Sequence, residues 1–300
     1  MPTPKVGHFR GERAREHYLG VYHAAMADLP PVREQADVST TFGTVRVYRF
    51  DGPSQGTPVV LLPGRNASTP MYGDNLPPLL ERRTVYCVDL LGEAGMSVQR
   101  QTITGPDDQA QWFDEALAGL GLDRVHLLGV SMGGWTAANA AIRRPGRAAS
   151  LVLLDPAMTF ATIPAKTIVA SMAMYLPGVP DAVLRRVLRW IAGGAELDDA
   201  PLVAALIAAG STDFKLRTPM PKLFTDDQLR TLDIPVLALI AGRSVIHNAE
   251  RATARARNLL PRGQVELWPD ASHAINGEYP VKVAETAEAF WDWVDAQRRA

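Results

Sequence analysis

The sequence predicts an α/β protein built on a doubly wound, mostly parallel sheet. Short apolar runs typical of buried strands alternate with stretches of helical periodicity along most of the 300 residues. Each run is stopped by Gly, Pro or Asp, and this alternation favours parallel strands joined by helices. The strand-type runs are residues 58–62, 85–90, 125–129, 150–154, 235–241 and 265–268.

The composition supports one large core. Hydrophobic residues make up 47% of the chain and the net charge is −1, so no strong field attracts nucleic acid or an anionic membrane. The single cysteine, Cys87, excludes a disulfide framework, and no apolar stretch approaches the ~20 residues of a membrane helix. The first residues lack the apolar region of a secretory signal. We expect a cytoplasmic protein with no nucleic-acid or membrane partner; the oligomeric state is left open.

Several elements flank or join the strand-type runs. Residues 38–41 and 44–50 predict a hairpin that turns at Phe42 and Gly43. Helical spacing of apolar residues, or a run of small ones, predicts helices over residues 12–28, 106–120, 135–142 and 280–298.

The most specific motif is Gly-Val-Ser-Met-Gly at residues 129–133. It lies between a strand-type run and a helix rich in small residues, which is the setting of a nucleophile elbow. Gly129 and Gly133 are needed there because a side chain at either position would clash with the neighbouring strand and helix. We therefore predict that Ser131 presents its hydroxyl above the sheet edge, at the positive end of a helix.

Residues 157–230 interrupt the alternation with helical stretches at 164–176, 181–191 and 201–209. We interpret them as a helical cap, so that residues 1–156 and 231–300 form the core and 157–230 the cap. Flexible apolar side chains in this region would either line a pocket or only fasten the cap to the core. These side chains are Met158, Phe160, Met172 and Met174.

Four polar or glycine-containing stretches follow strand-type runs directly: residues 63–65, Ser131, Asp155 and residues 242–247. In an open parallel sheet, ligands bind beyond the carboxyl ends of the strands. These stretches are therefore expected on one rim of the sheet.

With these motifs the chain resembles the α/β-hydrolase superfamily, most of all its small bacterial carboxylesterase-type members with a helical cap. The resemblance extends from about residue 38 to the last helix. It is carried by Leu61-Leu62-Pro63-Gly64, the run 89–97, the elbow and Asp270-Ala271-Ser272-His273. It implies the α/β-hydrolase fold, but the fold hosts many chemistries and does not name a substrate. Asp89, Glu93 and Ser97, in the loop after the run 85–90, could contact a substrate, but the resemblance implies structural roles for them.

The resemblance also implies a base and an acid for Ser131. His273 follows the last strand, where the superfamily places its base, whereas His126 lies within a strand and is interpreted as structural. The acid usually follows the next-to-last strand, but Ser244 occupies that place here. Some members carry it after the preceding strand, where Asp155 stands, and neighbouring strands lie only ~4.8 Å apart. We predict Asp155 as the acid; a loop anchor is the alternative.

Two backbone N–H groups should meet the negative charge that attack by serine creates on oxygen. The predicted donors are Met132, which follows the nucleophile, and Arg65, which follows Pro63 and Gly64. Members of the family usually have His-Gly where this chain has Pro-Gly, and a main-chain donor survives that change. No phosphate-binding loop and no metal-ligand spacing occurs, so we expect no cofactor and no metal.

These residues predict a serine hydrolase that cleaves a carboxylic ester or lactone of a small to medium apolar molecule through an acyl-enzyme on Ser131. Two alternatives remain open. The missing acid at the usual place and Pro63 would suit a ligand-binding protein without hydrolytic activity. The same scaffold would also suit a biosynthetic acyltransferase, thioesterase or cyclase.

Overall fold

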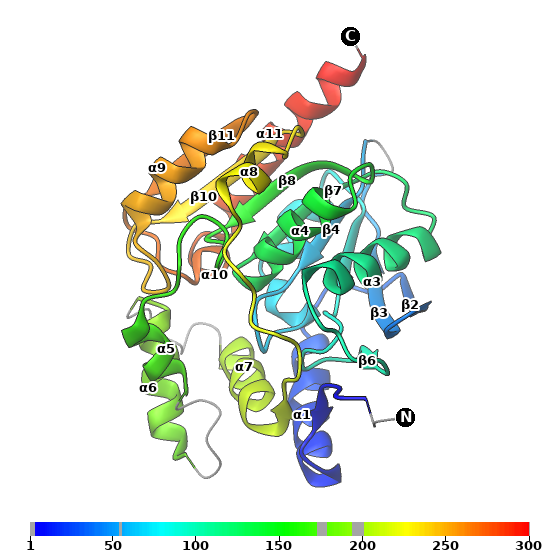
Figure 1. The fold of residues 1–300 in the computed structure, drawn as a ribbon. Helices are drawn as coiled ribbons and strands as arrows, with labels where there is room; N and C mark the ends of the chain where they lie inside the picture. Colours follow the sequence, from blue (N-terminus) through cyan, green and yellow to red (C-terminus); the bar gives the residue numbers. More distant parts are fainter. Residues whose placement is uncertain (1–3, 54–55, 173–178, 194–200, 300) are drawn as a thin grey trace.

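The computed structural model describes residues 4–53, 56–172, 179–193 and 201–299 (Figure 1). Its main feature within these residues is a sheet of nine strands in the order β11-β10-β8-β7-β4-β5-β3-β2, with β6 paired to β3. The strands from β11 to β5 run parallel, and β3, β2 and β6 add antiparallel pairs at one side. The predicted doubly wound, mostly parallel sheet is confirmed. The strands are β2 (Glu34–Thr40), β3 (Gly43–Phe50), β4 (Val59–Leu62), β5 (Val85–Val88), β6 (Val98–Gln99), β7 (Val125–Val130), β8 (Ala148–Leu154), β10 (Val236–Ala241) and β11 (Gly263–Trp268).

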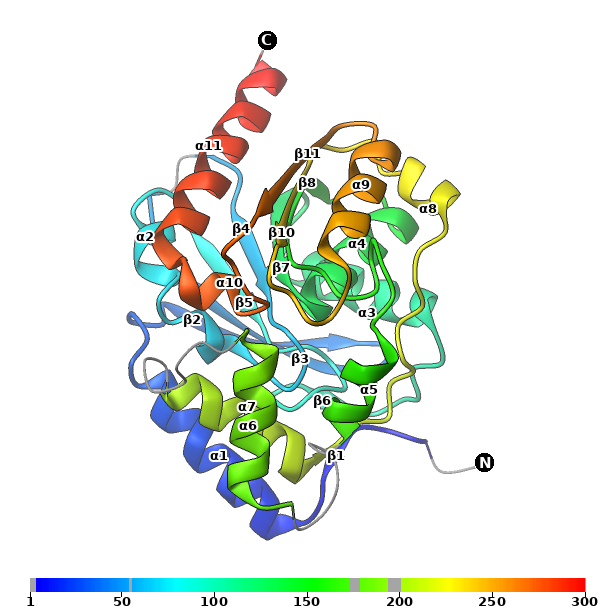
Figure 2. The ribbon, with the colours of Figure 1, turned by 90° about the vertical axis from the view of Figure 1, so that its left-hand side faces the viewer.

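Helices cover both faces of this sheet (Figure 2). Helices α3, α4 and α9 lie on one face, and α2 and α11 on the other. The helices outside the inserted segment are α1 (Glu12–Met26), the 3₁₀ turn η1 (Thr69–Tyr72), α2 (Leu76–Leu80), α3 (Pro106–Gly119), α4 (Met132–Arg143), α9 (Ala249–Leu259), α10 (Ile275–Glu278) and α11 (Pro280–Arg299).

The central strands β4, β7, β8 and β10 are buried at every position and mostly apolar, because both their faces are covered. In β7, Leu127 belongs to the core that contains Trp112 of α3. Its neighbour Leu128 faces the opposite side, in the core that contains Trp291 of α11. Period-two alternation thus sends successive side chains into two separate cores.

The hairpin of β2 and β3 is confirmed, although β2 begins earlier than predicted. Pairing continues from Val38 opposite Val45 to Glu34 opposite Arg49. The first residues of β2 are exposed and polar, so their sequence carries little apolar alternation. Helix α1 ends at Met26, two residues before the predicted end.

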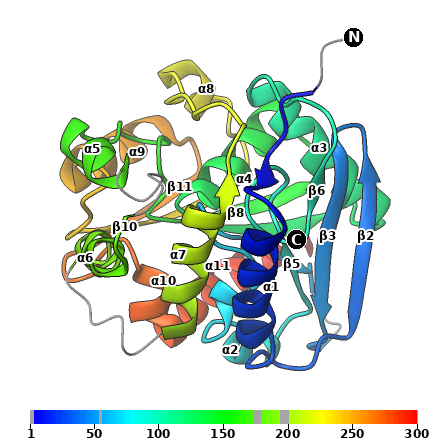
Figure 3. The same cartoon turned by 90° about the horizontal axis from the view of Figure 1, so that it is seen from below.

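A helical segment is inserted between β8 and β10, as expected. It contains α5 (Ala165–Met172), α6 (Asp181–Ile191), α7 (Pro201–Asp213), the short strand β9 (Phe214–Lys215) and α8 (Asp226–Arg230). Strand β1 (His8–Phe9) pairs antiparallel with β9, and α1 lies along α7 (Figure 3). The beginning of the chain is therefore fastened to the inserted segment. Two-residue strands such as β1 and β9 leave no periodic signal, so this pairing was not predicted.

A buried polar cluster lies at the amino ends of the parallel strands, opposite the predicted site. Arg83 has a side chain only 4% exposed and binds Glu288 at 2.8 Å and Asp295 at 2.8 Å. Nδ1 of His126 shares a hydrogen bond of 2.8 Å with Ser150 Oγ. The imidazole ring stacks on Trp291, and its Nε2 lies 3.3 Å from a carboxylate oxygen of Asp295. Burial lowers the pKa of His126, which agrees with its predicted structural role. Cys87 is a free, buried thiol.

Among the described residues, no helix is both long enough and apolar enough to cross a membrane.

Candidate active site

Ser131 occupies the sharp turn between β7 and α4. Its backbone has φ 53° and ψ −113°, a conformation rare for a residue with a side chain. A Cβ atom on Gly129 would lie 2.3 Å from the carbonyl carbon of Gly133, and one on Gly133 would lie 1.9 Å from the carbonyl oxygen of Leu62. The steric reason predicted for the two glycines is therefore present. The Ser131 N–H donates to the carbonyl of Leu154 at 3.0 Å, which ties the turn to the end of β8.

Ser131, His273 and Asp155 lie in one hydrogen-bonded row. The Oγ of Ser131 is 3.0 Å from Nε2 of His273, and Nδ1 of His273 is 2.7 Å from Oδ2 of Asp155. His273 stands between β11 and α10, far from Ser131 in sequence. A carboxylate can only accept a hydrogen bond, so it fixes the proton on Nδ1 and leaves the Nε2 lone pair facing the serine.

The carboxylate of Asp155 is completely buried at the end of β8. Its Oδ1 accepts the N–H of Ala241 at 3.0 Å, and its Oδ2 accepts the hydroxyl of Ser244 at 2.6 Å. Ser244 stands where the superfamily usually carries its acid. The segment after β10 therefore contributes hydrogen-bond donors to a carboxylate that the neighbouring strand supplies.

His247 is a further partner of Asp155 that was not predicted from the sequence. Its Nε2 lies 2.9 Å from Oδ1 of Asp155, and its side chain is 1% exposed. The available signal was its position beyond β10, which pairs with β8 up to Leu239 and Leu154. Burial by itself would raise the pKa of Asp155, but the charges and hydrogen bonds of His247 and His273 outweigh burial and hold this pKa below its usual range. Asp155 is therefore a carboxylate at neutral pH.

The turn after β4 lies against the serine. A Cβ on Gly64 would be 3.6 Å from Cβ of Ser131, and the N–H of Ala67 closes the turn on the Gly64 carbonyl at 3.2 Å. Arg65 and Met132 both line the cavity that contains Ser131. Met132 is the first residue of α4, where a helix leaves N–H groups without internal partners. The predicted donor residues are thus neighbours of the nucleophile.

A cavity of about 580 Å³ opens over Ser131 and His273 and extends beneath the inserted helices. Its walls on that side are mostly apolar, and they come mainly from α5, α6 and α7. The inserted residues include Ile163, Ile168, Met172, Leu188, Ile191, Val203, Ala204, Ile207 and Met220.

Of the apolar side chains considered for this pocket, Met172 lines it and Met174 lies outside the described residues. For Phe160 and Met158 the pocket interpretation is wrong. Phe160 is buried in the core on the α3 and α4 face of the sheet, and Met158 packs against that core. Met158 has φ 51°, so the chain turns sharply after β8 before it reaches α5.

The loop after β5 has the structural role that the resemblance implies, at least for Asp89. Its buried carboxylate accepts hydrogen bonds from the Thr69 N–H at 2.9 Å, the Met96 N–H at 2.9 Å and the Tyr22 hydroxyl at 2.9 Å. Asp89 thereby joins the loop to η1 and α1.

The comparisons with known proteins agree with this geometry. A family model described as "Alpha/beta hydrolase family" matches residues 59–286. The chain is 28% identical over 280 residues to carboxylesterase YbfK of Bacillus subtilis, covering 91% of this chain and 93% of that protein. It is 27% identical over 281 residues to nap, an uncharacterized carboxylesterase of the same organism, covering 92% of each. The crystal structure of naproxen esterase from B. subtilis superposes with a TM-score of 0.86 at 25% identity, over 94% of this chain and 99% of that one.

Proposed function

We propose, from the premise that this chain belongs to the alpha/beta hydrolase family, that it is a serine hydrolase of carboxylic esters or lactones. The observation that carries the proposal is the row of Ser131 Oγ, His273 and Asp155 at 3.0 and 2.7 Å. The likeness to the two B. subtilis carboxylesterases over most of their length supports the same activity. A ligand-binding protein would not need a serine hydroxyl aligned with an imidazole and a buried carboxylate.

The proposed reaction has two halves. Ser131 Oγ attacks the acyl carbon while Nε2 of His273 takes the hydroxyl proton, and Asp155 stabilises the resulting imidazolium. The acyl oxygen becomes an oxyanion that the N–H groups of Met132 and Arg65 stabilise. Collapse of this intermediate expels the alcohol, which takes the proton from His273. Water then attacks the acyl-enzyme in the same way and releases the acid.

The shape of the cavity supports an apolar substrate of small to medium size. About 580 Å³ is within the range of sites that bind small molecules, and the inserted helices present mainly aliphatic side chains to it. We infer that the apolar part of the ester lies beneath these helices, with its acyl carbon at Ser131.

The direct test is hydrolysis of p-nitrophenyl esters from acetate to decanoate, combined with labelling by a fluorophosphonate. We expect ester cleavage and labelling of the wild-type protein, and loss of both in Ser131→Ala. Folded wild-type protein that neither labels nor cleaves any of these esters would contradict the proposal and favour a binding function. Transfer of the acyl group to an added alcohol or amine in preference to water would favour the acyltransferase alternative.

The position of the inserted helices gives a prediction about substrate length. Ala204 of α7 lines the cavity, whereas the adjacent Ala205 is exposed. Ala204→Phe should lower kcat/KM for the longest esters by about 10- to 100-fold because the added ring fills space that their chains need. Acetate hydrolysis should change little. Ala205→Phe is the matched control. Equal effects of the two substitutions on the ester series would show that the acyl chain of the substrate does not lie along α7.

A further inference from the structure

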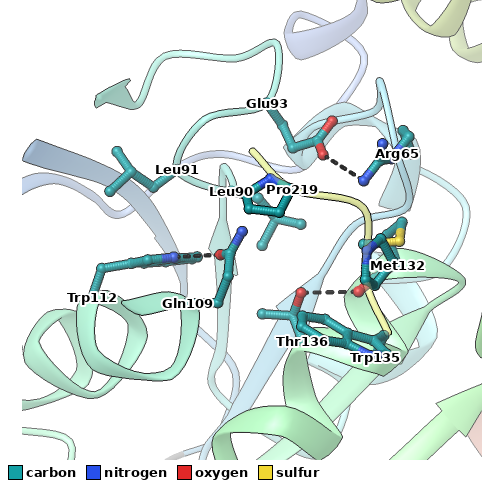
Figure 4. A pocket seen from close by; sticks show the side chains of 11 residues that line it. Arg65, Leu90, Leu91, Glu93, Gln109, Trp112, Met132, Trp135, Thr136 and Pro219 are labelled. Atoms are coloured by element: carbon teal, nitrogen blue, oxygen red, sulfur yellow. Dashed lines mark hydrogen bonds and ion pairs between the residues drawn. The ribbon is translucent and has the colours of Figure 1, made fainter. Parts of the chain in front are cut away.

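Glu93 contacts the turn that contains Arg65 and Asn66. Its side chain is 6% exposed, and Oε2 accepts the backbone N–H of Asn66 at 3.3 Å. Its other oxygen, Oε1, lies 3.6 Å from a guanidinium nitrogen of Arg65 (Figure 4). One buried carboxylate therefore binds the backbone of Asn66 and the side chain of Arg65, two consecutive residues of the turn.

The turn contains a residue in an uncommon backbone conformation. Asn66 has φ 58°, in the left-handed region that few residues other than glycine and asparagine adopt. The Asn66 N–H that Glu93 binds belongs to the peptide unit between Arg65 and Asn66, whereas the Arg65 N–H belongs to the preceding unit. Rotation of the unit between Arg65 and Asn66 changes the backbone angles at Arg65, so it would turn the Arg65 N–H relative to Ser131.

The inserted helix α7 holds the same residue from the other side. The Asn66 side-chain amide donates to Ser211 Oγ at 2.9 Å, and Ser211 in turn donates to the carbonyl of Ile207. A Cβ on Gly210 would lie 2.5 Å from the Asn66 carbonyl oxygen, so the helix backbone touches the turn. Asn66 is thus held between Glu93 and α7.

A small cavity on another side of Glu93 is too small for a ligand. The cavity beside Glu93, Arg65 and Met132 in Figure 4 measures about 10 Å³, enough for roughly one water molecule. A carboxylate buried there is therefore not part of a second substrate site.

We propose that Glu93 is a positioning residue for the oxyanion hole, which keeps the Arg65 N–H aimed at the reacting oxygen by fixing the Arg65–Asn66 turn. This inference rests on the proposed hydrolase function. It goes beyond the structural role that the family resemblance implies for Glu93, since it connects this side chain to stabilisation of the transition state. Glu93 touches no substrate atom and acts only through the turn.

The test compares ground-state and transition-state effects in Glu93→Ala. The probe is a trifluoromethyl ketone analogue of the best ester, which forms an oxyanion-bearing adduct with Ser131. We expect kcat to fall by about 10- to 100-fold with KM nearly unchanged. A small displacement of the Arg65 N–H would weaken its hydrogen bond to the oxyanion and so remove much of its stabilisation of the transition state. The affinity for the ketone should fall by the same factor as kcat/KM. Exchange of the Asn66 amide hydrogen should become faster.

Glu93→Gln is the conservative variant. Its amide oxygen can still accept the Asn66 N–H, but it cannot balance the charge of Arg65, so its losses should lie between those of wild type and Glu93→Ala. If the alanine variant does not fold, the proposal is judged on the kcat, KM and ketone affinity of the glutamine variant. The exposed Glu285→Ala serves as the surface control.

The possible outcomes separate the two proposals. A folded Glu93→Ala protein with wild-type kcat, ketone affinity and Asn66 exchange would overturn the role of Glu93 and leave the hydrolase function standing. A general loss of stability with kcat, KM and ketone affinity unchanged would also overturn it. Faster Asn66 exchange in Glu93→Ala, beside a wild-type protein that cleaves no ester, would refute the hydrolase function while showing that Glu93 holds the turn.

Discussion

Replacing Asp155 by asparagine should lower kcat for ester hydrolysis by about 10⁴-fold with little change in KM. The size of the effect follows from the hydrogen bond between Asp155 Oδ2 and Nδ1 of His273. An asparagine amide in this place can turn an N–H toward the ring, and Nδ1 must then accept instead of donate. The proton moves to Nε2, which faces Ser131, and the histidine can no longer take the proton of the serine.

Asp270→Asn is the matched control for this experiment. Asp270 is closer to His273 in sequence, but it is exposed and no hydrogen bond between the two side chains occurs in the described structure. Its variant should keep nearly all activity. Circular dichroism and thermal unfolding should show that both variants fold. If folded Asp155→Asn retained turnover near the wild-type value, Asp155 would be a loop anchor, and the acid would have to be sought elsewhere.

The elbow could be predicted from the sequence because most of its constraints are local. A Cβ on Gly129 would meet Gly133, four residues away, so this constraint can be read from the spacing, whereas the constraint on Gly133 comes from Leu62 of the neighbouring strand β4. The same holds for the parallel sheet, since strands buried on both faces produce continuous apolar runs. His273 and Asp155 were predicted from the family resemblance, which places the base after the last strand and, in some members, the acid after the strand that precedes the usual one.

The contacts that complete the site could not be predicted, because they join segments through side-chain direction. His247 and Ser244 reach Asp155 only because β10 pairs with β8 in one particular register. A shift of one residue would turn the side chains of β10 to the opposite face of the sheet. The position of Phe160 could not be predicted either, because an apolar side chain suits the core as well as the pocket. Composition alone cannot choose between two buried surfaces.

A second large effect is expected on the stability of the protein, from the buried cluster around Arg83 at the amino ends of the parallel strands. Arg83→Leu should lower the free energy of unfolding by about 3–5 kcal/mol at neutral pH, because it removes the buried cation of the cluster and leaves Glu288 and Asp295 only their longer ion-pair contacts with Arg82 and His126. Glu288 and Asp295 would lose their contacts of 2.8 Å with the guanidinium. Leucine fills part of the volume but cannot accept or donate a hydrogen bond. Urea unfolding would measure the loss as a lower midpoint.

Arg82→Leu provides a control with nearly the same partners in a different environment. Arg82 is 56% exposed and reaches Glu288 at 3.6 Å and Asp292. Water already solvates its charge, so its removal should cost only about 0–1 kcal/mol. We therefore attribute the larger effect of Arg83 to its burial. Similar losses in the free energy of unfolding for the two variants would contradict this explanation.

The loss caused by Arg83→Leu should also depend on pH, in a direction that the pKa values fix. Burial already raises the pKa of Glu288, and without Arg83 that pKa should rise further. A group whose pKa is higher in the folded state favours folding below its unfolded pKa and loses that contribution as the pH rises through its folded pKa. For Asp295, burial alone would raise the pKa, but His126 and Arg83 hold it low, so in the wild type its contribution is lost as the pH falls. The change at Glu288 makes the difference between wild type and Arg83→Leu smaller at about pH 5 than at about pH 7.5, whereas the contribution of Asp295 is lost only below its unfolded pKa of about 3.9. A difference that grew on acidification would show that the cluster is not held together by ionised carboxylates.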